Sequence, residues 1–247
     1  MEYIRSQLGR EPNSVEWGML DTMYSEHCSY KSSRRLLKQL HFTNSTVIAG
    51  PGYDCGLVDV GDGFAVGFKV ESHNHPSALD PYNGAATGIG GIVRDILAVG
   101  ARPIGLLDLL RFGSPSSAHS RWLLDYVVRG IADYGNCIGV PTVAGDVEFD
   151  DSFGVNCLVN VGCLGVVRKD RILLGALRRP GDLLLLVGGS TGRDGIHGVT
   201  FASRTLTSES EQDRPAVQIG DPFTKKIVIE AVLEALDTAR ISALKDL

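Results

Sequence analysis

The residues best suited to chemistry lie in one stretch, GFAVGFKVESHNHPS, at residues 63–77. If this stretch is a strand, its side chains alternate between two faces. One face carries only apolar residues, Phe64, Val66, Phe68 and Val70. The other carries two small residues and then four ionisable ones, Ala65, Gly67, Lys69, Glu71, His73 and His75. We expect the apolar face to pack on the core and the ionisable face to line a ligand site; an edge strand kept soluble by its charges is the alternative.

The next segment, NGAATGIGGIVRDILAVG, predicts a helix with two distinct sides. Its apolar residues have the spacing of a buried stripe, Ile89, Ile92, Val93, Ile96 and Leu97. Another side is nearly free of side chains and ends in opposite charges, Gly84, Thr87, Gly88, Gly91, Arg94 and Asp95. Such a surface lets a ligand approach the backbone closely. Packing of a second helix against the glycines is the alternative.

These two segments together indicate phosphoryl chemistry assisted by a metal ion. Glu71 and Asp95 are the hard carboxylates that Mg²⁺ prefers, and Lys69 and Arg94 are cations that suit phosphate groups. Histidines such as His73 can transfer protons near neutral pH. Neither segment matches the P-loop pattern GxxxxGKS/T, and GIGGIV lacks the third glycine of the dinucleotide fingerprint.

The composition excludes several other classes of protein. With 43% hydrophobic and 21% charged residues, the 247-residue chain has the make-up of a globular protein. Its net charge of -5 argues against nucleic-acid binding, and we expect its one basic cluster to be a solvated helix face, Lys31, Arg34, Arg35 and Lys38. The longest apolar run, residues 183–187, is too short to cross a membrane. Without a secretory signal at the start, the chain is predicted to be cytoplasmic.

The five cysteines are expected to be ordinary reduced thiols, because their number is odd and no CxxC pair occurs. Cys28 stands beside His27, where we expect buried packing rather than nucleophilic catalysis. No cysteine lies in the glycine-flanked turn that exposes a nucleophile. The chain is therefore not expected to hydrolyse glutamine.

The elements that must position these residues predict an α+β fold with a largely antiparallel sheet. A helix broken near Ser29 and capped by Asn13 or Ser14 is expected over residues 15–40, and two or three strands over 47–70. Then follow the helix through Val99, a strand at 106–110, a helix over 117–134 stopped by Gly135, and a buried strand in VNCLVNVGCLGVV.

A boundary is predicted near residue 170, dividing the chain into domains 1–170 and 171–247. The second domain is expected to be part of an α/β unit with a strand at LLLLVG and a helix from Asp221 and Pro222 to about Ala239. Its loop GRDGIHG, with Arg193, suits a phosphate or is a plain surface turn. The final ISALKDL resembles an incoming strand with nothing to pack against, so this domain is expected to be truncated.

Several motifs closely resemble the large, or synthetase, subunit of phosphoribosylformylglycinamidine synthase. They run from about residue 8 to the end: LGREPNSVEWGML, SEHCSYKSSR, AGPGYDCG, FKVESHNHPS, PYNGAATGIGGIVRDILAVGARPIGLLDLLRFG and GRDGIHGVTFAS. That family belongs to the aminoimidazole ribonucleotide synthetase superfamily. The resemblance implies an N-terminal domain that forms a barrel when it pairs with a like domain.

The resemblance also implies the reaction, an ATP-dependent C–N ligation of de novo purine biosynthesis. ATP phosphorylates the amide oxygen of formylglycinamide ribonucleotide with the help of Mg²⁺, and ammonia then displaces phosphate from the iminophosphate to give the amidine. A glutaminase subunit and a small bridging subunit supply the ammonia.

Carried over position by position, the resemblance implies catalytic roles for His27 and for His73, the proton acceptor. Tyr30 and Lys69 would contact ATP. Glu71 would bind one Mg²⁺, and Asp95 with Asp246 a second. The ribonucleotide would be contacted by six residues, Ser72, His73, Asn74, His75, Arg94 and Gln218.

One departure is length, because members of that family are much longer and contain a second, related pair of domains. We therefore expect this piece alone to be inactive and to form homodimers through exposed apolar surface. The competing functions are another synthetase or kinase of the superfamily, such as thiamine monophosphate kinase, and a non-catalytic nucleotide-binding module. Mg-ATP binding without turnover would identify the module.

Overall fold

The computed structural model of the chain describes residues 2–40, 44–176, 179–190, 192–203, 205–206, 210–238 and 241–247. Its centre is a six-stranded sheet with the order β1-β2-β3-β6-β4-β5. The strands are β1 (Val47–Ala49), β2 (Gly56–Gly61), β3 (Phe64–Ser72), β4 (Arg102–Phe112), β5 (Thr142–Phe149) and β6 (Leu158–Arg168). All neighbours pair antiparallel except β4 and β5. The α+β class and the largely antiparallel sheet are confirmed, and the sheet is open rather than closed.

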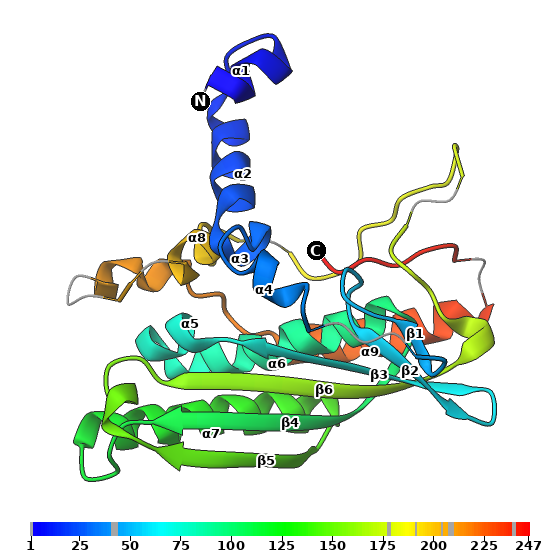
Figure 1. Ribbon diagram of the computed structural model, residues 1–247. Helices are drawn as coiled ribbons and strands as arrows, with labels where there is room; N and C mark the ends of the chain where they lie inside the picture. Colours follow the sequence, from blue (N-terminus) through cyan, green and yellow to red (C-terminus); the bar gives the residue numbers. More distant parts are fainter. Residues whose placement is uncertain are drawn as a thin grey trace.

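Helices cover one face of this sheet in two layers (Figure 1). The first layer is α6 (Pro81–Ala98) on the central strands with α7 (Ala118–Ile138) beside it, and α9 (Pro222–Thr238) packs on both helices. Asp80 begins α6 by accepting a hydrogen bond from the backbone N–H of Asn83, with Pro81 as the first helical residue. The expected end of α7 at Gly135 is wrong. The helix continues to Ile138, and its C-cap Gly139 takes the left-handed conformation at φ 76°.

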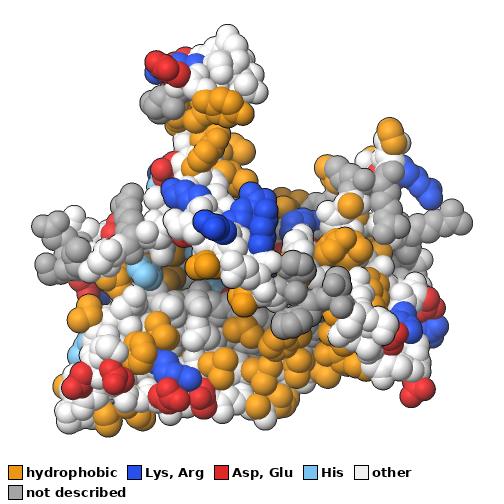
Figure 2. All heavy atoms as spheres, in the orientation of Figure 1, with side chains coloured by type: hydrophobic (Ala, Val, Ile, Leu, Met, Phe, Trp, Pro, Cys, Tyr) orange, Lys and Arg blue, Asp and Glu red, His pale blue; other side chains and the backbone are white. Residues whose placement is uncertain are grey.

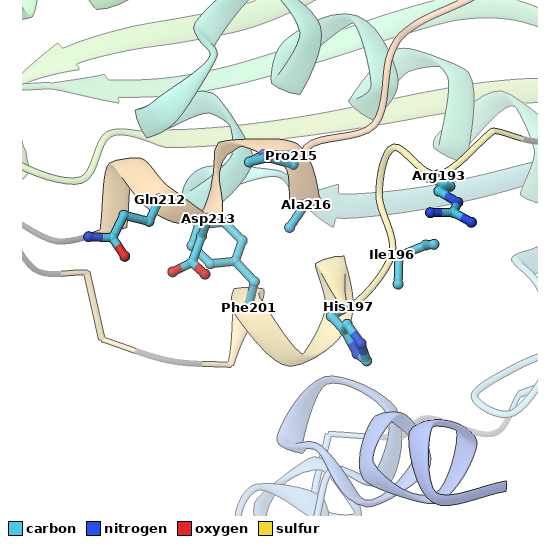
Figure 3. A pocket seen from close by; sticks show the side chains of 8 residues that line it. All are labelled: Arg193, Ile196, His197, Phe201, Gln212, Asp213, Pro215 and Ala216. Atoms are coloured by element: carbon cyan, nitrogen blue, oxygen red, sulfur yellow. The ribbon is translucent and has the colours of Figure 1, made fainter. Parts of the chain in front are cut away.

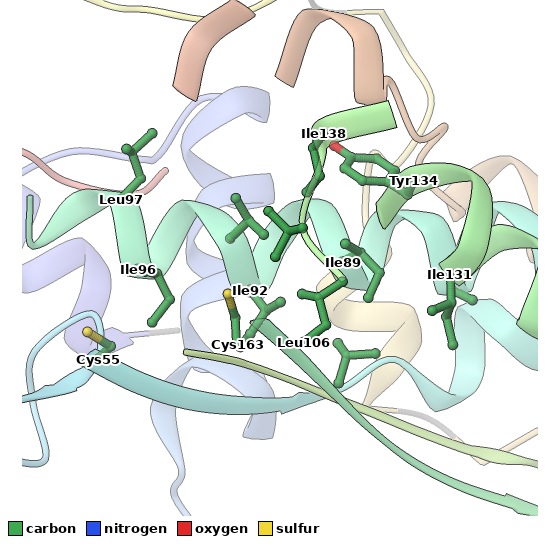
Figure 4. Packing of buried hydrophobic residues seen from close by; sticks show 14 of the residues in the cluster. Cys55, Ile89, Ile92, Ile96, Leu97, Leu106, Ile131, Tyr134, Ile138 and Cys163 are labelled. Carbon is green, nitrogen blue, oxygen red and sulfur yellow. The ribbon is translucent and has the colours of Figure 1, made fainter. Parts of the chain in front are cut away.

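The core lies between the sheet and α6 (Figure 4). The apolar stripe predicted for this helix is confirmed, since all five members are buried, Ile89, Ile92, Val93, Ile96 and Leu97. A close approach of helix and sheet depends on Gly165 of β6, where a Cβ atom would lie 2.2 Å from Ile96 Cγ2. The fixed spacing of α6 and β3 positions the ionisable residues of both elements.

The prediction that the apolar face of β3 packs on the core is wrong. The small residues Ala65 and Gly67 face the helix layer, whereas the apolar residues Phe64, Phe68 and Val70 are exposed. Gly67 leaves room for Cys55 Sγ and Ile96 Cδ1, which would lie 3.3 and 3.6 Å from a Cβ atom there. The helix must come close to this strand, so the small side chains point towards it. We call the uncovered side the open face of the sheet.

Exposed apolar residues from several other strands are Val58, Val60, Ile104, Val143, Val147 and Phe149. Figure 2 shows hydrophobic side chains gathered over the sheet. Strand β5 was not predicted; it lies at the sheet edge, parallel to β4, and its residues are all exposed. Because β5 pairs with a neighbouring strand on one side only and none of its residues is buried, its sequence shows no alternation of buried and exposed residues.

The strand expected at LLLLVG is not formed in the described part of the chain. Residues 182–187 lie outside the described strands, and Leu183 is 96% exposed. A strand needs a hydrogen-bonded neighbour, and the described sheet offers none to this segment. The final segment, residues 241–247, is likewise not a strand, although it does find packing partners, as described below.

The N-terminal helices rise from the body as a stalk (Figure 1). The helix expected over residues 15–40 is three helices, α2 (Ser14–Tyr24), α3 (Glu26–Ser29) and α4 (Arg34–Leu37), preceded by α1 (Glu2–Leu8). Asn13 caps α2 as expected. The break lies at Ser25, which caps α3, and at Tyr30, which ends it in the left-handed conformation. The predicted basic cluster is exposed, as expected.

Short helices complete the chain: α5 (Asn74–Leu79), α8 (Gly198–Ala202) and the 3-10 helices η1 (Asp151–Phe153), η2 (Lys169–Arg171) and η3 (Ser210–Ala216). The helix end expected at Ala239 lies outside the described residues. None of the helices in the described ranges is both long enough and apolar enough to span a membrane.

Candidate functional site

The centre of the site is the end of β3 that carries ionisable residues, facing α6. Lys69 Nζ lies 2.8 Å from Asp95 Oδ1 and 4.0 Å from Glu71 Oε1. Lys69 and Glu71 alternate on the strand, and Asp95 comes from the last turns of the helix, where it is only 3% exposed. The period-two and helical spacings predicted from the sequence therefore bring these three residues together.

Burial and the neighbouring charges both shift the pKa values of this cluster. Burial opposes the charged form of Lys69, but its hydrogen bond to Asp95 and the nearby carboxylates outweigh burial and raise its pKa. The pKa of Asp95 is raised to about 7, chiefly by burial, and further by the charges of Glu71 and Asp246 against the lowering effect of Lys69. A simple ion pair would lower the pKa of its carboxyl group. Here burial outweighs the lowering effect of Lys69, and the charges of Glu71 and Asp246 add to it.

His73 follows the strand and precedes α5, with its ring against α6. A Cβ atom on Gly88 would lie 3.1 Å from His73 Cγ, and one on Gly91 would lie 3.8 Å from its Nε2. Burial lowers the pKa of His73; the charge of Glu71 opposes this shift, whereas those of His27 and Arg94 add to it. The imidazole is thus neutral at neutral pH and able to accept a proton.

The glycines of α6 serve two purposes. Gly88 and Gly91 make room for the His73 ring, as a ligand-site surface requires. Gly84 instead lets α5 approach, because a Cβ atom there would lie 2.4 Å from the backbone nitrogen of Ser77. Helix packing against the glycines is therefore confirmed at Gly84, and the approach of a ligand to the surface around Gly88 and Gly91 stays a prediction.

Arg94 joins the helix to the end of the chain. Its Nε donates a hydrogen bond to Asp246 Oδ1 at 2.5 Å. Lys225 of α9 lies near this pair, and burial, followed by the charge of Arg94, lowers its pKa to about 8. The sequence analysis did not single out Lys225, because its position near Arg94 depends on the packing of α9 against α6.

The carboxylates could hold Mg²⁺, judged by their chemistry and charge. Glu71, Asp95 and Asp246 are hard oxygen donors, and the charges of Glu71 and Asp246, which add to the effect of burial in raising the pKa of Asp95, would be offset by a bound cation. Across the described ranges, no three His, Cys, Asp or Glu residues form a preassembled metal cage. This arrangement fits Mg²⁺, which commonly takes one or two carboxylates and completes its shell with phosphate and water.

His27 approaches the cluster from the stalk. Its backbone N–H donates to Ser203 Oγ at 3.3 Å, which ties α3 to α8. Its charge also acts on His73, so the two predicted catalytic histidines lie on one side of the molecule. Tyr30 lies one turn further along and its ring is half exposed. Cys28 is exposed, so the burial expected for it is wrong.

The remaining predicted substrate residues surround the cluster but are partly engaged in the fold. Ser72 Oγ donates to Asn160 Oδ1 at 2.6 Å, and Asn74 Oδ1 accepts from the backbone of Val159 at 2.7 Å. The His75 ring lies edge-on to Phe201, with centroids 5.8 Å apart. The backbone oxygen of Gln218 accepts a hydrogen bond from Thr87 Oγ1 on α6 at 3.0 Å.

A separate cavity of about 260 Å³ lies beside the loop GRDGIHG (Figure 3). Its lining includes Arg193 and His197 of this loop, Phe201 of α8 and Asp213 of η3. His197 takes the left-handed conformation at φ 62°. Phe201 lines this cavity and also contacts the ring of His75. Lys69, Glu71 and Asp95 do not line the cavity.

Parts of the chain match three known protein families. Residues 52–167 match the AIR synthase related protein, N-terminal domain, and residues 179–247 match its C-terminal domain. Residues 1–31 match the formylglycinamide ribonucleotide amidotransferase linker domain.

Two relatives are phosphoribosylformylglycinamidine synthase subunits PurL. The one from Methanothermobacter marburgensis is 61% identical, and the one from Methanobrevibacter smithii is 62% identical. Both alignments cover 100% of this chain and 35% of the relative. The chain thus spans about a third of the length of these relatives.

Solved structures of Thermotoga maritima PurL are also similar. PurL complexed with FGAR has a TM-score of 0.86 and 44% identity, covering 100% of this chain and 38% of that one. PurL complexed with ATP has a TM-score of 0.76 and 42% identity, covering 96% and 35%. The structure of PurLQS has a TM-score of 0.77 and 40% identity, covering 100% and 36%. With its linker, N-terminal and C-terminal matches in this order, the chain belongs to the AIR synthase related family, within the group of PurL subunits of phosphoribosylformylglycinamidine synthase.

Proposed function

We propose that this chain forms the ATP- and substrate-binding part of an ATP-dependent C–N ligase. The reaction is the conversion of formylglycinamide ribonucleotide to its amidine in purine biosynthesis. One observation carries the proposal: Lys69 with Asp95, His73, and Arg94 with Asp246 converge from β3, α6 and the end of the chain. Further support comes from the relatives complexed with FGAR and with ATP.

The first proposed step moves the γ-phosphoryl group of ATP onto the amide oxygen of the substrate. An amide oxygen is a poor leaving group until it is phosphorylated, and ADP leaves in this step. Lys69 would bind phosphate oxygens, and Tyr30 would contact the nucleotide. Glu71 would hold one Mg²⁺, and Asp95 and Asp246 another; bound Mg²⁺ supplies neutralisation of the phosphate charge.

The second proposed step is the attack of ammonia on the amide carbon, which releases phosphate and leaves the amidine. The attacking nitrogen must lose a proton as the new C–N bond forms. A buried, neutral His73 suits this role because its lowered pKa leaves a free ring nitrogen at neutral pH. His27 would assist, and six neighbouring residues would hold the ribonucleotide, Ser72, His73, Asn74, His75, Arg94 and Gln218.

We further propose that ammonia comes from a separate glutaminase subunit, delivered with a small bridging subunit. Burial raises the pKa of Cys55 to about 11 and of Cys157 and Cys163 to about 12, so these thiols are poor nucleophiles. The similar structure of PurLQS supports an assembly of this kind. In this proposal residues 1–170 and 171–247 are two domains, and the protein acts in the cytoplasm.

Calorimetric titration of the 247-residue chain with ATP tests the nucleotide part of the proposal. Binding should weaken at least tenfold when Mg²⁺ is removed with a chelator, because Lys69 alone cannot balance a triphosphate near Glu71 and Asp95. Lys69→Met should weaken binding in Mg²⁺ as well. Lys226→Met is the matched control, since Lys226 pairs with Glu230 on α9. Equal affinity with and without chelator would argue against the site.

A further inference from the structure

The residue next to Asp246 is held by a second ion pair. The ammonium group of Lys245 contacts the carboxylate of Asp54, whose side chain is only 5% exposed, although Lys245 itself is 58% exposed. Asp246 meanwhile pairs with Arg94 of α6. Two consecutive residues of segment 241–247 are thus tied to two different parts of the fold.

Asp54 is buried beside the core. It directly precedes Cys55, a buried member of the core, and the strand β2. Cys55 Sγ would lie 3.3 Å from a Cβ atom on Gly67, which stands two residues before Lys69 on β3. Movement of Asp54 relative to the site would therefore disturb the core.

The lack of a side chain at Gly175 leaves room for this ion pair. A Cβ atom there would lie 2.9 Å from Lys245 Cδ and 3.3 Å from Asp54 Oδ2. The backbone oxygen of Leu244 would be 3.0 Å away. The segment is therefore in close contact with this glycine, the Asp54 carboxylate and Arg94.

The order of charges in the segment fixes its register. Lys245 and Asp246 are adjacent in the sequence but pair with different partners, Asp54 and Arg94. A shift by one residue would bring Lys245 towards Arg94, with like charges together, and leave the buried Asp54 without a cation. Ile241, Ala243 and Leu244 offer no charge to replace Lys245.

We propose that the Asp54–Lys245 ion pair sets the register of residues 241–247 and thereby positions Asp246 at the charged site. Both are positioning residues, since they act through Asp246. The inference rests on the proposed function in one respect, the part of Asp246 in cation binding.

Binding of Mn²⁺, used as a paramagnetic substitute for Mg²⁺, tests the consequence for the site. Electron paramagnetic resonance of the 247-residue chain should show binding weakened roughly tenfold by Asp54→Asn and more by Lys245→Gln, which leaves a buried carboxylate unpaired. In the double variant the two amides can hydrogen-bond, and most of the affinity should return. Asp170→Asn, which removes an exposed ion pair with Arg168, should change nothing.

A metal-free measurement separates this inference from the proposed function. In protein labelled with ¹⁵N-arginine, the Arg94 Nε–H signal reports on the hydrogen bond to Asp246 and can be assigned with Arg94→Lys. Each single variant should move this signal towards that of a solvated arginine, and the double variant should restore it. An unchanged signal in both single variants would overturn the inference. If the Arg94 signal moves in the single variants but the wild-type chain binds no Mn²⁺, the role of the Asp54–Lys245 pair in setting the register is supported and the proposed cation site is wrong.

Discussion

The ionisable side chains at the site are held in an arrangement that the unligated fold does not favour. Asp95 is buried beside Lys69, and burial, together with the charges of Glu71 and Asp246, raises its pKa despite this ammonium group. Such unfavourable charge is characteristic of sites that bind ions and phosphates. It leads to a prediction about stability and pH.

We expect Asp95→Asn to stabilise the chain at pH 8 in the absence of divalent cations. A carboxyl pKa raised from 3.8 to about 7 means that the folded state binds the proton more tightly, so the Asp95 contribution to stability falls as pH rises through this window. The free energy of unfolding should increase by about 1 to 3 kcal/mol at pH 8 and by less at pH 5. Thermal unfolding at both pH values checks this, with Asp170→Asn as the exposed control. If Asp95→Asn instead lowered the free energy of unfolding equally at both pH values, the Asp95 carboxylate would be fully compensated by its partners in the folded chain.

His73→Ala should lower turnover in the polypeptide that contains this chain, by roughly 10² to 10⁴, while nucleotide affinity stays nearly unchanged. A proton acceptor acts in the chemical step, so its loss appears in kcat. Because the pKa of His73 is lowered, the acidic limb of the pH–rate profile should fall below pH 6.5 in the wild-type protein. His119→Ala, on the solvent side of α7 and stacked on Trp122, is the matched control. Wild-type turnover of His73→Ala would remove the assigned role.

At this scale the sequence predicted much of the site. The alternation of Lys69, Glu71 and His73 and the helical position of Asp95 were sufficient to bring these residues together. Lys225 and the Asp54–Lys245 pair were not predicted, because they depend on how distant segments meet in space. Local periodicity contains no information about such contacts.

At the scale of elements, the site depends on the close approach of its helices. Gly130 of α7 faces α6, and a Cβ atom there would lie 2.3 Å from the backbone oxygen of Tyr82. We expect Gly130→Ala to lower the free energy of unfolding by about 1 to 3 kcal/mol, because a backbone atom cannot yield as a flexible side chain would. Chemical denaturation measures this.

Gly18→Ala is the matched control for this substitution. Gly18 lies within α2 with open space around its Cβ position, and alanine is the better helix former. It should leave stability unchanged or raise it by up to about 1 kcal/mol. If Gly130→Ala behaved in the same way, the close packing of α6 and α7 would not be needed.

The types and order of the elements were largely predictable, but the orientation of β3 was not. An alternating strand with one apolar and one ionisable face normally buries the apolar one. Here Ala65 and Gly67 face the core because α6 crosses the strand closely, and Phe64 and Phe68 lie on the open face. The strand predicted at LLLLVG was wrong for a related reason. A strand needs a hydrogen-bonded neighbour, and the amino-acid composition of a segment does not show whether one is present.

At the scale of the whole molecule, the open face exposes apolar side chains from several strands. Its exposed residues include Phe68 and Val143, and isolated surfaces of this kind mark interfaces. We expect the 247-residue chain to self-associate at micromolar concentration. Phe68→Glu with Val143→Glu should reduce association in light scattering, whereas Leu36→Glu on α4 should not. A stable wild-type monomer would contradict this prediction.

The nitrogen source tests the account most directly. The site offers a proton acceptor for ammonia, whereas three cysteines are buried with raised pKa values and none of the five lies in the glycine-flanked turn of a nucleophile, so we expect this chain not to hydrolyse glutamine. The measurement is amidine formation from formylglycinamide ribonucleotide and Mg-ATP by the purified polypeptide that contains this chain, supplied with either ammonium at alkaline pH or glutamine. We predict product from ammonium, and almost none from glutamine until a glutaminase and its small bridging subunit are added. Product from glutamine by this polypeptide alone, in a preparation free of glutaminase, or no product from ammonium, would contradict the account.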